Sequence, residues 1–243
     1  MTPDTAAHLL ALNRQFYDTY SGEFSNTRRG IPPGMQRLLS TLPAEATVLD
    51  LGCGNGRVAG FLAENNWHSR YTGLDGSERL LTEACRMIPV LPQAEFLQAN
   101  LSETGWEDRL TVETYDIILA FAVLHHIPSH ALRLRFVQAV HRHLNRQGRF
   151  MLSNWQFLNS ARLRARIQPW EKAGLCVDNV DEGDYLLDWR QGGIGLRYVH
   201  HFSDTSLAEL AGEAGFHVSE TFLSDGEGEK LSLYQVWEYN KPL

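Results

Sequence analysis

The sequence is poor in cysteine and has no long hydrophobic run. Its 243 residues contain three cysteines and no CxxC pair. Three scattered thiols cannot form the disulfide framework of a small secreted protein, and no paired cysteines are available to hold zinc. The longest apolar run, Ile117 to Leu124, is closed by His125 and His126, and it falls well short of the roughly 20 residues that cross a bilayer. We therefore expect neither a disulfide scaffold, a metal site nor a membrane span.

The charge balance is mildly acidic and the composition is that of an ordinary globular protein. Hydrophobic residues make up 43% and charged residues 21%, and the formal net charge is −7. A chain with this net charge is weakly repelled by a polyanion, so any nucleic-acid site must be a local patch. The first fifteen residues lack a basic start and are broken by polar residues, so we expect no secretory signal peptide and a cytoplasmic protein.

Short apolar strands alternate with helices along most of the chain. Strands are predicted at residues 46–50, 71–75, 96–98, 115–121, 148–155, 216–223 and 231–239. Helices are predicted at residues 8–20, 35–42, 57–65, 78–87, 131–144 and 206–214. This alternation predicts an α/β fold with a doubly wound, mostly parallel seven-stranded sheet. The polar stretch with Gly226 and Gly228 between the last two strands predicts that they pair antiparallel.

The chain shows no internal repeat, low-complexity tract or linker, which favours one domain over residues 1–243. Within it we expect an N-terminal helical cap at 1–43 and a cofactor-binding core at 45–155. Residues 156–202 depart from the strand-helix rhythm and are interpreted as a substrate-side insertion or lid. Residues 203–243 are expected to form the final helix and a β-hairpin.

A glycine-rich turn follows the first predicted strand. The run V-L-D-L-G-C-G-N-G-R puts little side-chain bulk between a strand and a helix, where a ligand can approach backbone amides at the helix start. Arg57 stands where the dinucleotide fingerprint GxGxxG needs glycine, and the phosphate loop GxxxxGK[ST] is absent. S-adenosylmethionine fits this turn better, with Asp50 orienting it and the amino-acid end of the cofactor over Gly52 to Gly54. Cys53 is interpreted as a small loop residue rather than a nucleophile.

Asp75 supplies the second half of the predicted cofactor site. It ends the next strand, 25 residues after Asp50, where a carboxylate can accept hydrogen bonds from both hydroxyls of a ribose. A glycine-rich turn of this kind, followed by a helix and a strand that ends in Asp, is a strong signal of a cofactor site.

These motifs resemble those of the class I S-adenosylmethionine-dependent methyltransferases over residues 45 to 155. The matching runs are V-L-D-L-G-C-G-N-G-R, Y-T-G-L-D-G-S, F-L-Q-A-N-L and Y-D-I-I-L-A-F-A-V-L-H-H-I. The resemblance implies a Rossmann-like methyltransferase fold, S-adenosylmethionine as cofactor and S-adenosylhomocysteine as product. It also implies that Gly76 and Ser77 follow the ribose-binding Asp, that Asn100 and Leu101 lie beside the adenine, and that the methionine moiety is bordered by Ala120 and Phe121.

Two further stretches narrow the resemblance. F-Y-D-T-Y-S-G-E-F-S-N-T-R-R at 16–29, and G-D-Y-L-L-D-W with R-Y-V-H-H-F within 183–202, are similar to the tRNA methyltransferases that esterify the carboxymethyl group on wobble uridine. The likeness implies tRNA as methyl acceptor. Eukaryotic members of that family work with a small zinc-containing activator protein, so such a partner is implied as well.

A carboxylate is already a nucleophile, so its methylation needs alignment and exclusion of water more than a general base. Arginine can hold both carboxylate oxygens, and Arg28 and Arg197 are the candidates. Arg28 can alternatively hold the carboxylate of the cofactor.

Histidines supply the other catalytic candidates. His125 and His126 follow the fourth strand, where an imidazole can act as a general base or serve as a hydrogen-bonded structural group. His200 and His201 lie in the late motif, and one of two adjacent strand residues must point away from the acceptor.

Basic residues at 162, 164 and 166 are placed on a helix, with Arg162 and Arg166 on one face. Together with Arg142, His143, Arg146 and Arg149 they form either a phosphate-binding stripe or an ordinary solvated surface.

Three functions remain open on the sequence. The first is methylation of a modified wobble uridine in tRNA. The second is methylation of a small acid, phenol or amine, with residues 156–202 as a lid. The third is a cofactor-binding scaffold without catalysis.

Overall fold

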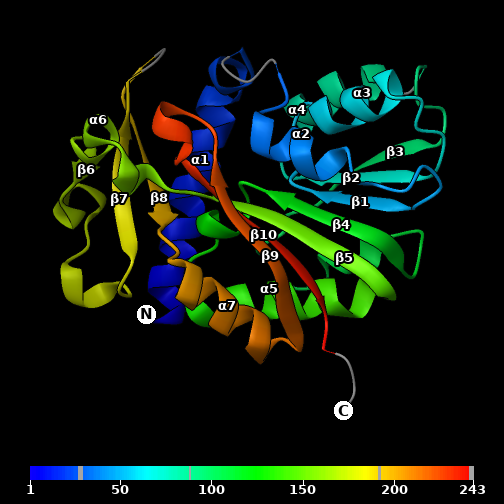
Figure 1. Ribbon diagram of the computed structural model, residues 1–243. Coiled ribbons are helices and arrows are strands. Elements are labelled where there is room, and N and C mark those ends of the chain that lie inside the picture. Colours follow the sequence, from blue (N-terminus) through cyan, green and yellow to red (C-terminus); the bar gives the residue numbers. More distant parts are fainter. Residues whose placement is uncertain (27–29, 88, 191–192, 241–243) are drawn as a thin grey trace.

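A seven-stranded sheet forms the centre of the computed structural model, which describes residues 1–26, 30–87, 89–190 and 193–240. Its strands are β1 (Val48–Leu51), β2 (Tyr71–Asp75), β3 (Ala94–Gln98), β4 (Tyr115–Phe121), β5 (Leu144–Trp155), β9 (Phe216–Ser224) and β10 (Ser232–Tyr239). The strand order is β3-β2-β1-β4-β5-β10-β9 (Figure 1). The first five strands run parallel, and β10 pairs antiparallel with both β5 and β9. The predicted doubly wound sheet with an antiparallel last strand is confirmed.

Helices cover both faces of this sheet. The α-helices are α1 (Pro3–Asn26), α2 (Pro33–Leu39), α3 (Arg57–Glu64), α4 (Glu78–Ala84), α5 (His130–His143), α6 (Ala161–Arg164) and α7 (Asp204–Glu213). Single-turn 3-10 segments are η1 (Cys85–Met87), η2 (Trp106–Arg109), η3 (Leu124–His126), η4 (Phe157–Asn159), η5 (Trp170–Ala173), η6 (Val177–Asn179) and η7 (Glu227–Glu229). Apolar residues of α2 and α3 pack in one buried cluster, and those of α5 and α7 in another.

Strand β4 contributes side chains to both buried clusters. Ile117 and Leu119 belong to the cluster under α2 and α3, whereas Ile118 and Ala120 belong to the cluster under α5 and α7. Side chains alternate across a strand, so a strand covered on both faces needs a nearly continuous apolar run. The run at 115–121 therefore marks the middle of the sheet.

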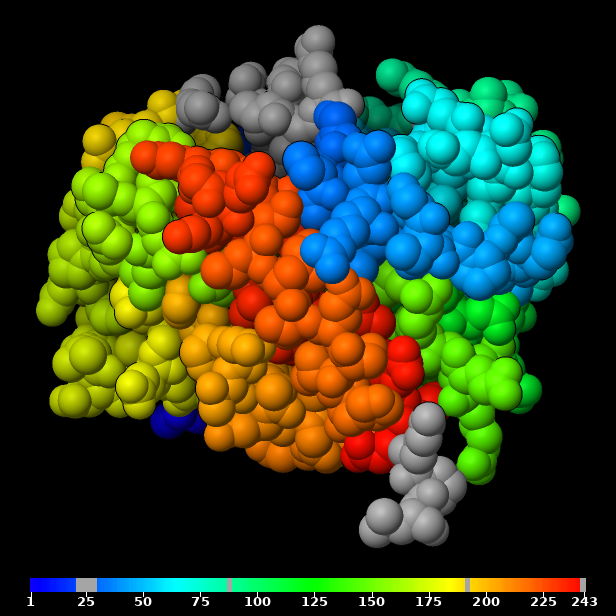
Figure 2. Space-filling model, viewed as in Figure 1, coloured from blue at the N-terminus to red at the C-terminus, as the bar shows by residue number. Residues whose placement is uncertain are grey.

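Residues 156–202 form a small lobe with its own sheet. Strands β6 (Ile167–Gln168), β7 (Asp184–Trp189) and β8 (Gly195–His200) pair antiparallel in the order β6-β7-β8. Phe157, Leu163, Leu187 and Val199 form its buried cluster. Figure 2 shows the lobe, in yellow-green, against the orange and red C-terminal segments. Helix α1 packs along β8 and lies between the lobe and the main sheet (Figure 1).

The prediction that Arg162 and Arg166 share one helical face is wrong. Helix α6 ends at Arg164, so Arg166 does not share a helical face with Arg162. The other basic residues lie around the start and middle of β5, whereas α6 follows the end of that strand (Figure 1). Arg142 is also paired with Glu107 at 2.6 Å. Four residues make barely one turn, too few to line up side chains four positions apart.

No helix within the described ranges is long and apolar enough to cross a membrane.

Candidate active site

A cavity of about 810 Å³ opens where β1, β2 and β4 end, and most predicted cofactor residues line it. Because the carboxyl ends of parallel strands share one edge of the sheet, loops far apart in sequence meet there. The predicted residues that line the cavity are Gly52, Cys53, Gly54, Asp75, Gly76, Ser77, Asn100, Leu101 and Phe121.

The glycine loop turns in a conformation that favours residues without a side chain. Gly52 and Gly54 have φ values of 75° and 57°, in the left-handed region. A Cβ on Gly52 would stand 2.4 Å from Cγ2 of Val123, whereas a Cβ on Gly54 would meet nothing within 4 Å. The loop is thus packed on one side and open toward the cavity on the other. This is a cradle into which a cofactor fits.

Asp75 joins this loop to the next one. Its Oδ2 accepts a hydrogen bond from the Gly54 N–H at 2.9 Å, and its Oδ1 accepts one from the Ser77 N–H at 2.8 Å. Burial raises the pKa of Asp75, and the backbone donors oppose that rise. A carboxylate that has spare acceptor capacity and lines the cavity is suited to hold ribose hydroxyls.

Asp50 and Ala120 lie behind the cavity wall and do not line it. The Asp50 carboxylate is 2% exposed and accepts a hydrogen bond from the Tyr71 hydroxyl at 2.6 Å. Burial raises the pKa of Asp50 to about 6, although the Tyr71 hydrogen bond lowers it. Ala120 is packed in the core under α5 and α7. Both residues support the wall from behind.

Cys53 lines the cavity with a protonated thiol. Burial raises its pKa well above the ordinary value, and the nearby Asp50 charge raises it further. Since the thiolate is the reactive form of cysteine, this environment agrees with a small loop residue rather than a nucleophile.

The loop after β3 forms another wall. Asn100 Oδ1 accepts a hydrogen bond from the Ser102 N–H at 3.1 Å, and its Nδ2 donates to Glu103 at 2.8 Å. Leu101 adds an apolar side chain, and buried Trp106 closes this part of the cavity. An amide and apolar side chains suit an uncharged base such as adenine.

A second cavity, of about 440 Å³, adjoins the first and shares Arg57, Ala122 and His126 with it. Ala122 has a φ of 61°, and its N–H donates to the Ser153 carbonyl at 2.9 Å. Strained backbone of this kind is concentrated at functional sites. A cofactor in the first cavity and an acceptor in the second would therefore meet at this shared wall.

Arg197 enters the second cavity from β8 as a buried cation that has no carboxylate partner among the described residues. It is 5% exposed, and its guanidinium lies 4.6 Å from the Trp155 ring centroid, 5.5 Å from Phe16 and 5.7 Å from Trp189. Its Nε has no hydrogen-bond partner, and no carboxylate in the described parts of the chain forms an ion pair with it. Burial lowers the pKa of Arg197, and the neighbouring Tyr17 hydroxyl opposes this effect.

The two adjacent histidines have different surroundings. His125 is buried at the second cavity. Its Nδ1 lies 3.3 Å from Asn154 Oδ1 and 3.4 Å from the backbone nitrogen of Trp155. His126 lines both cavities, and its Nε2 lies 2.7 Å from the Tyr17 hydroxyl. His126 is therefore the histidine at the junction.

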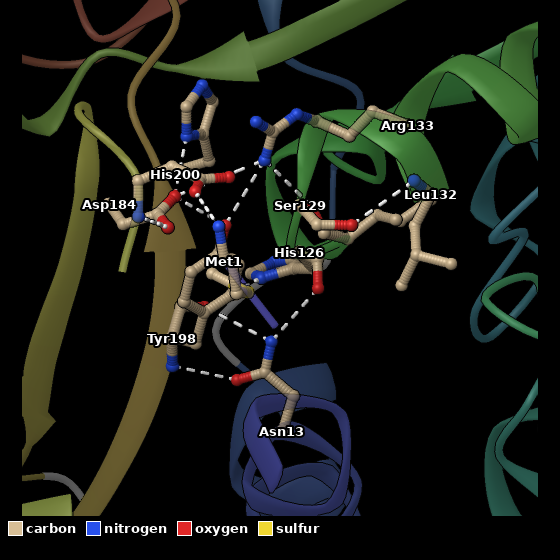
Figure 3. A network of polar contacts seen from close by, with 11 residues as sticks. Met1, Asn13, His126, Ser129, Leu132, Arg133, Asp184, Tyr198 and His200 are labelled. Atoms are coloured by element: carbon tan, nitrogen blue, oxygen red, sulfur yellow. Dashed lines mark hydrogen bonds and ion pairs between the residues drawn. The ribbon is translucent and has the colours of Figure 1, made fainter. Parts of the chain in front are cut away.

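His200 lies away from both cavities. Figure 3 shows it with Asp184 and Tyr198, where its Nδ1 is 2.7 Å from Asp184 Oδ1. Asp184 also accepts a hydrogen bond from the Tyr198 hydroxyl at 2.6 Å and lies 4.0 Å from Arg133. Because side chains alternate along β8, Arg197 and His200 point to opposite faces of the strand. The other predicted arginine, Arg28, lies outside the described residues.

Sequence reasoning found only part of the contribution of α1. Asn13 and Tyr17 line the first cavity from this helix. Tyr17 lies in the stretch 16–29 that carries the family resemblance, whereas the only signal for Asn13 was helical periodicity, which indicates which face is buried. Arg57 was noted only as a missing glycine, although its position directly after the loop was a usable signal. Across the described residues there is no group of three or more side chains suited to bind a metal.

Comparisons with known proteins agree with this geometry. The model of the methyltransferase domain family matches residues 24–221. A protein of Encephalitozoon cuniculi that is provisionally named a methyltransferase is 31% identical over 92% of this chain and 93% of its own length. The tRNA (carboxymethyluridine(34)-5-O)-methyltransferase of Schizosaccharomyces pombe is 28% identical over 58% of this chain. The trans-aconitate 2-methyltransferase of Azoarcus sp. is 38% identical over 40% of it. The matched parts make up 56% and 36% of those two enzymes.

Solved structures share the fold. The Burkholderia thailandensis 1,6-didemethyltoxoflavin-N1-methyltransferase, with S-adenosylhomocysteine bound, superposes with a TM-score of 0.67 at 21% identity, over 99% of this chain and 92% of its own. The glycine cradle, the placement of Asp75 and the family match lead to one conclusion. The chain belongs to the methyltransferase domain family and is an S-adenosylmethionine-dependent methyltransferase.

Proposed function

We propose that this enzyme methylates a carboxylate, and that the acceptor is the carboxymethyl group of a wobble uridine in tRNA. The observation that carries the proposal is Arg197, a buried guanidinium without a carboxylate partner in the described residues, facing a cavity beside the cofactor cavity. An unpaired buried charge is costly, and an anionic ligand removes that cost. The S. pombe relative, whose name specifies carboxymethyluridine, supports this acceptor.

The aromatic rings around Arg197 suit it to this task. Trp155, Trp189 and Phe16 hold the guanidinium in place and keep water from it. A shielded, charge-assisted hydrogen bond to a carboxylate contributes about 1.5–3 kcal/mol. Arg197 therefore binds and orients the acceptor, and Arg28 stays a second candidate for this role.

The bound cofactor supplies a methyl group on a positively charged sulfur. Transfer would form a bond between a carboxylate oxygen and the methyl carbon as the carbon–sulfur bond breaks and S-adenosylhomocysteine leaves, so the chain need not remove a proton. His126, at the wall between the cavities, and His125, at the second cavity, then act in positioning and in excluding water. His126 is oriented for this by the Tyr17 hydroxyl.

Methylation of a small carboxylic acid is the second candidate. The similarity to trans-aconitate methyltransferase favours it, and a cavity of about 440 Å³ is of a size that takes a small acid. The net charge of −7 also fits this candidate. If tRNA is the acceptor, affinity for its phosphates comes either from the basic residues around β5 and α6 or from an activator protein of the kind the family resemblance implies.

The test is transfer of radiolabelled methyl from S-adenosylmethionine into total tRNA and into an RNA-free metabolite extract. Each arm uses the wild type, Asp75→Ala, Arg197→Met and Arg197→Lys, and the tRNA arm is repeated with the activator protein. We expect label in tRNA that is lost in Asp75→Ala and reduced at least about 100-fold in Arg197→Met, with only partial recovery in Arg197→Lys, because lysine lacks the planar fork. Label only in the extract identifies the small-acid enzyme. Labelling that is indifferent to Arg197 overturns the carboxylate proposal.

A further inference from the structure

The second cavity is lined by a carboxylate as well as by the two cations Arg57 and Arg197. Asp225, in the turn between β9 and β10, lines the same cavity as Arg197. The two side chains form no ion pair. Opposite charges that share a cavity without neutralising each other are available to two different groups of one ligand.

Asp225 is held firmly in position. Its Oδ2 accepts a hydrogen bond from the Tyr234 hydroxyl at 2.6 Å, and its Oδ1 accepts one from the Gly34 N–H at 2.9 Å. Burial and the Asp225 contact raise the pKa of Tyr234, so this hydroxyl stays a donor. An ionised carboxylate has about four acceptor positions. Each Asp225 oxygen therefore keeps acceptor capacity for a ligand.

The backbone at Asp225 is strained, which supports a functional role for its side chain. Its φ is 67°, in the left-handed region that non-glycine residues rarely adopt. The Leu231 N–H donates to the Asp225 carbonyl at 3.0 Å and closes the turn. Strain of this kind persists where the surrounding structure demands a particular side-chain placement.

The charge of Asp225 also acts on the wall between the cavities. Burial lowers the pKa of Arg57, and Asp50, Tyr234 and Asp225 oppose this effect. Arg57 lines both cavities, so the field of Asp225 extends to the boundary with the cofactor.

We infer that the acceptor is bound at two points: its carboxylate at Arg197, and an N–H or O–H donor at Asp225. The inference rests on the proposed function, because it takes the methylated group to be a carboxylate. In a carboxymethyluridine the donor is the imide N3–H of the base, and in a small acid it is a hydroxyl or amine. Asp225 is thus a specificity-determining residue that rejects carboxylates lacking a donor.

The test compares acceptors that differ in this donor. The first pair is an anticodon stem-loop RNA carrying 5-carboxymethyluridine and the same RNA with a methyl on N3 of that base. The second pair is malate and succinate, which differ by one hydroxyl. Wild type, Asp225→Gly, Asp225→Asn and Tyr234→Phe are assayed for kcat/KM, with S-adenosylhomocysteine affinity and thermal unfolding as checks on the fold.

We expect the wild type to prefer the donor-bearing member of the pair that it methylates by at least about 10-fold. Asp225→Gly suits the positive φ but lacks the carboxylate, so its preference falls to about 1-fold. Asp225→Asn keeps a neutral acceptor and part of the preference, and Tyr234→Phe disturbs the same turn but keeps the carboxylate and the preference. Equal use of both members by the wild type, or a preference unchanged in Asp225→Gly, overturns the inference and leaves the proposed function standing. Transfer to none of the four carboxylates overturns the proposed function itself.

Discussion

The Asn13 side chain makes two hydrogen bonds to the backbone of Tyr198. Its Oδ1 accepts from the Tyr198 N–H at 2.8 Å, and its Nδ2 donates to the Tyr198 carbonyl at 3.1 Å (Figure 3). Strand β8 is an edge of the small sheet, so one side chain of α1 satisfies backbone groups that a further strand would otherwise bind. Asn13 Nδ2 also lies 3.2 Å from the His126 carbonyl. Helix α1 thereby ties the strand that carries Arg197 to the junction of the two cavities.

Replacement of Asn13 by alanine should loosen that strand. The substitution leaves the buried N–H and carbonyl of Tyr198 without partners, which costs about 1–3 kcal/mol. Because Arg197 directly precedes Tyr198, we also expect a several-fold higher KM for the acceptor. Urea unfolding and acceptor kinetics measure the two effects. Gln15→Ala, an exposed position on the same helix, is the matched control and should change neither. An Asn13→Ala protein as stable as the wild type would contradict the role assigned to these hydrogen bonds.

Asp75→Ala should weaken cofactor binding about 10- to 100-fold, because hydrogen bonds to a charged group contribute about 1.5–3 kcal/mol. The variant also releases the Gly54 and Ser77 N–H groups, so the loop loses its fixed shape. Calorimetric titration with S-adenosylhomocysteine measures the effect. Glu64→Ala, at an exposed position at the end of α3, should bind like the wild type. An unchanged dissociation constant for Asp75→Ala would remove Asp75 from the ribose site.

Gly52→Ala should mainly lower the folding stability, whereas Gly54→Ala should mainly lower the affinity for the cofactor. At Gly52 the methyl group meets Val123 at 2.4 Å in addition to the positive φ, so we expect a loss of folding stability of about 2–4 kcal/mol. At Gly54 the added methyl group has open space around it, so stability falls by only about 1–2 kcal/mol. This methyl group stands where the cofactor would lie, so affinity should fall at least about 10-fold. Thermal unfolding without ligand and titration with S-adenosylhomocysteine separate the two. Equal stability losses would argue against the packed loop.

The folding stability should carry a pH dependence from Asp50. Its pKa is about 6 in the folded protein against 3.8 for an ordinary Asp, so the folded state binds the proton more tightly between these values. Stability is therefore greater at the acid end of that window and falls as the pH rises through it, by about 2–3 kcal/mol. Asp50→Asn keeps an acceptor for Tyr71 but has no proton to lose.

The measurement is urea unfolding of the wild type and Asp50→Asn at pH 4 and pH 7.5. We expect the stability of Asp50→Asn relative to the wild type to increase by about 2–3 kcal/mol between the two conditions. Tyr71→Phe removes the hydrogen bond that lowers this pKa, so the window should extend to higher pH. A stability difference independent of pH would show that Asp50 is ionised at both.

Most of the fold and of the candidate cofactor site could be predicted from local patterns. The run at 115–121 was recognisable as a central strand because burial on both faces demands apolar residues at every position. The glycine loop and Asp75 were recognisable because backbone conformation and strand ends are encoded within a few residues. The same rule explains why Asp50 was assigned to the site, because the predicted strand ends at Asp50. In the structure β1 continues to Leu51, and the Asp50 side chain is buried and bonded to the Tyr71 hydroxyl.

The acceptor cavity depended on contacts between distant segments. Arg197 from β8 and Asp225 from the β9–β10 turn line this cavity, and Asn13 and Tyr17 from α1 line the adjoining one. These segments meet only when the small lobe packs on α1. Which side chains of β8 face the cavity depends on the register of β7 and β8 and on what covers each face of the strand. Local sequence thus specifies the strands, the turns and the cofactor loop, because their causes are short-range. The choice of Arg197 over His200 is a tertiary outcome, since only the packed fold gives each face of that strand its partners.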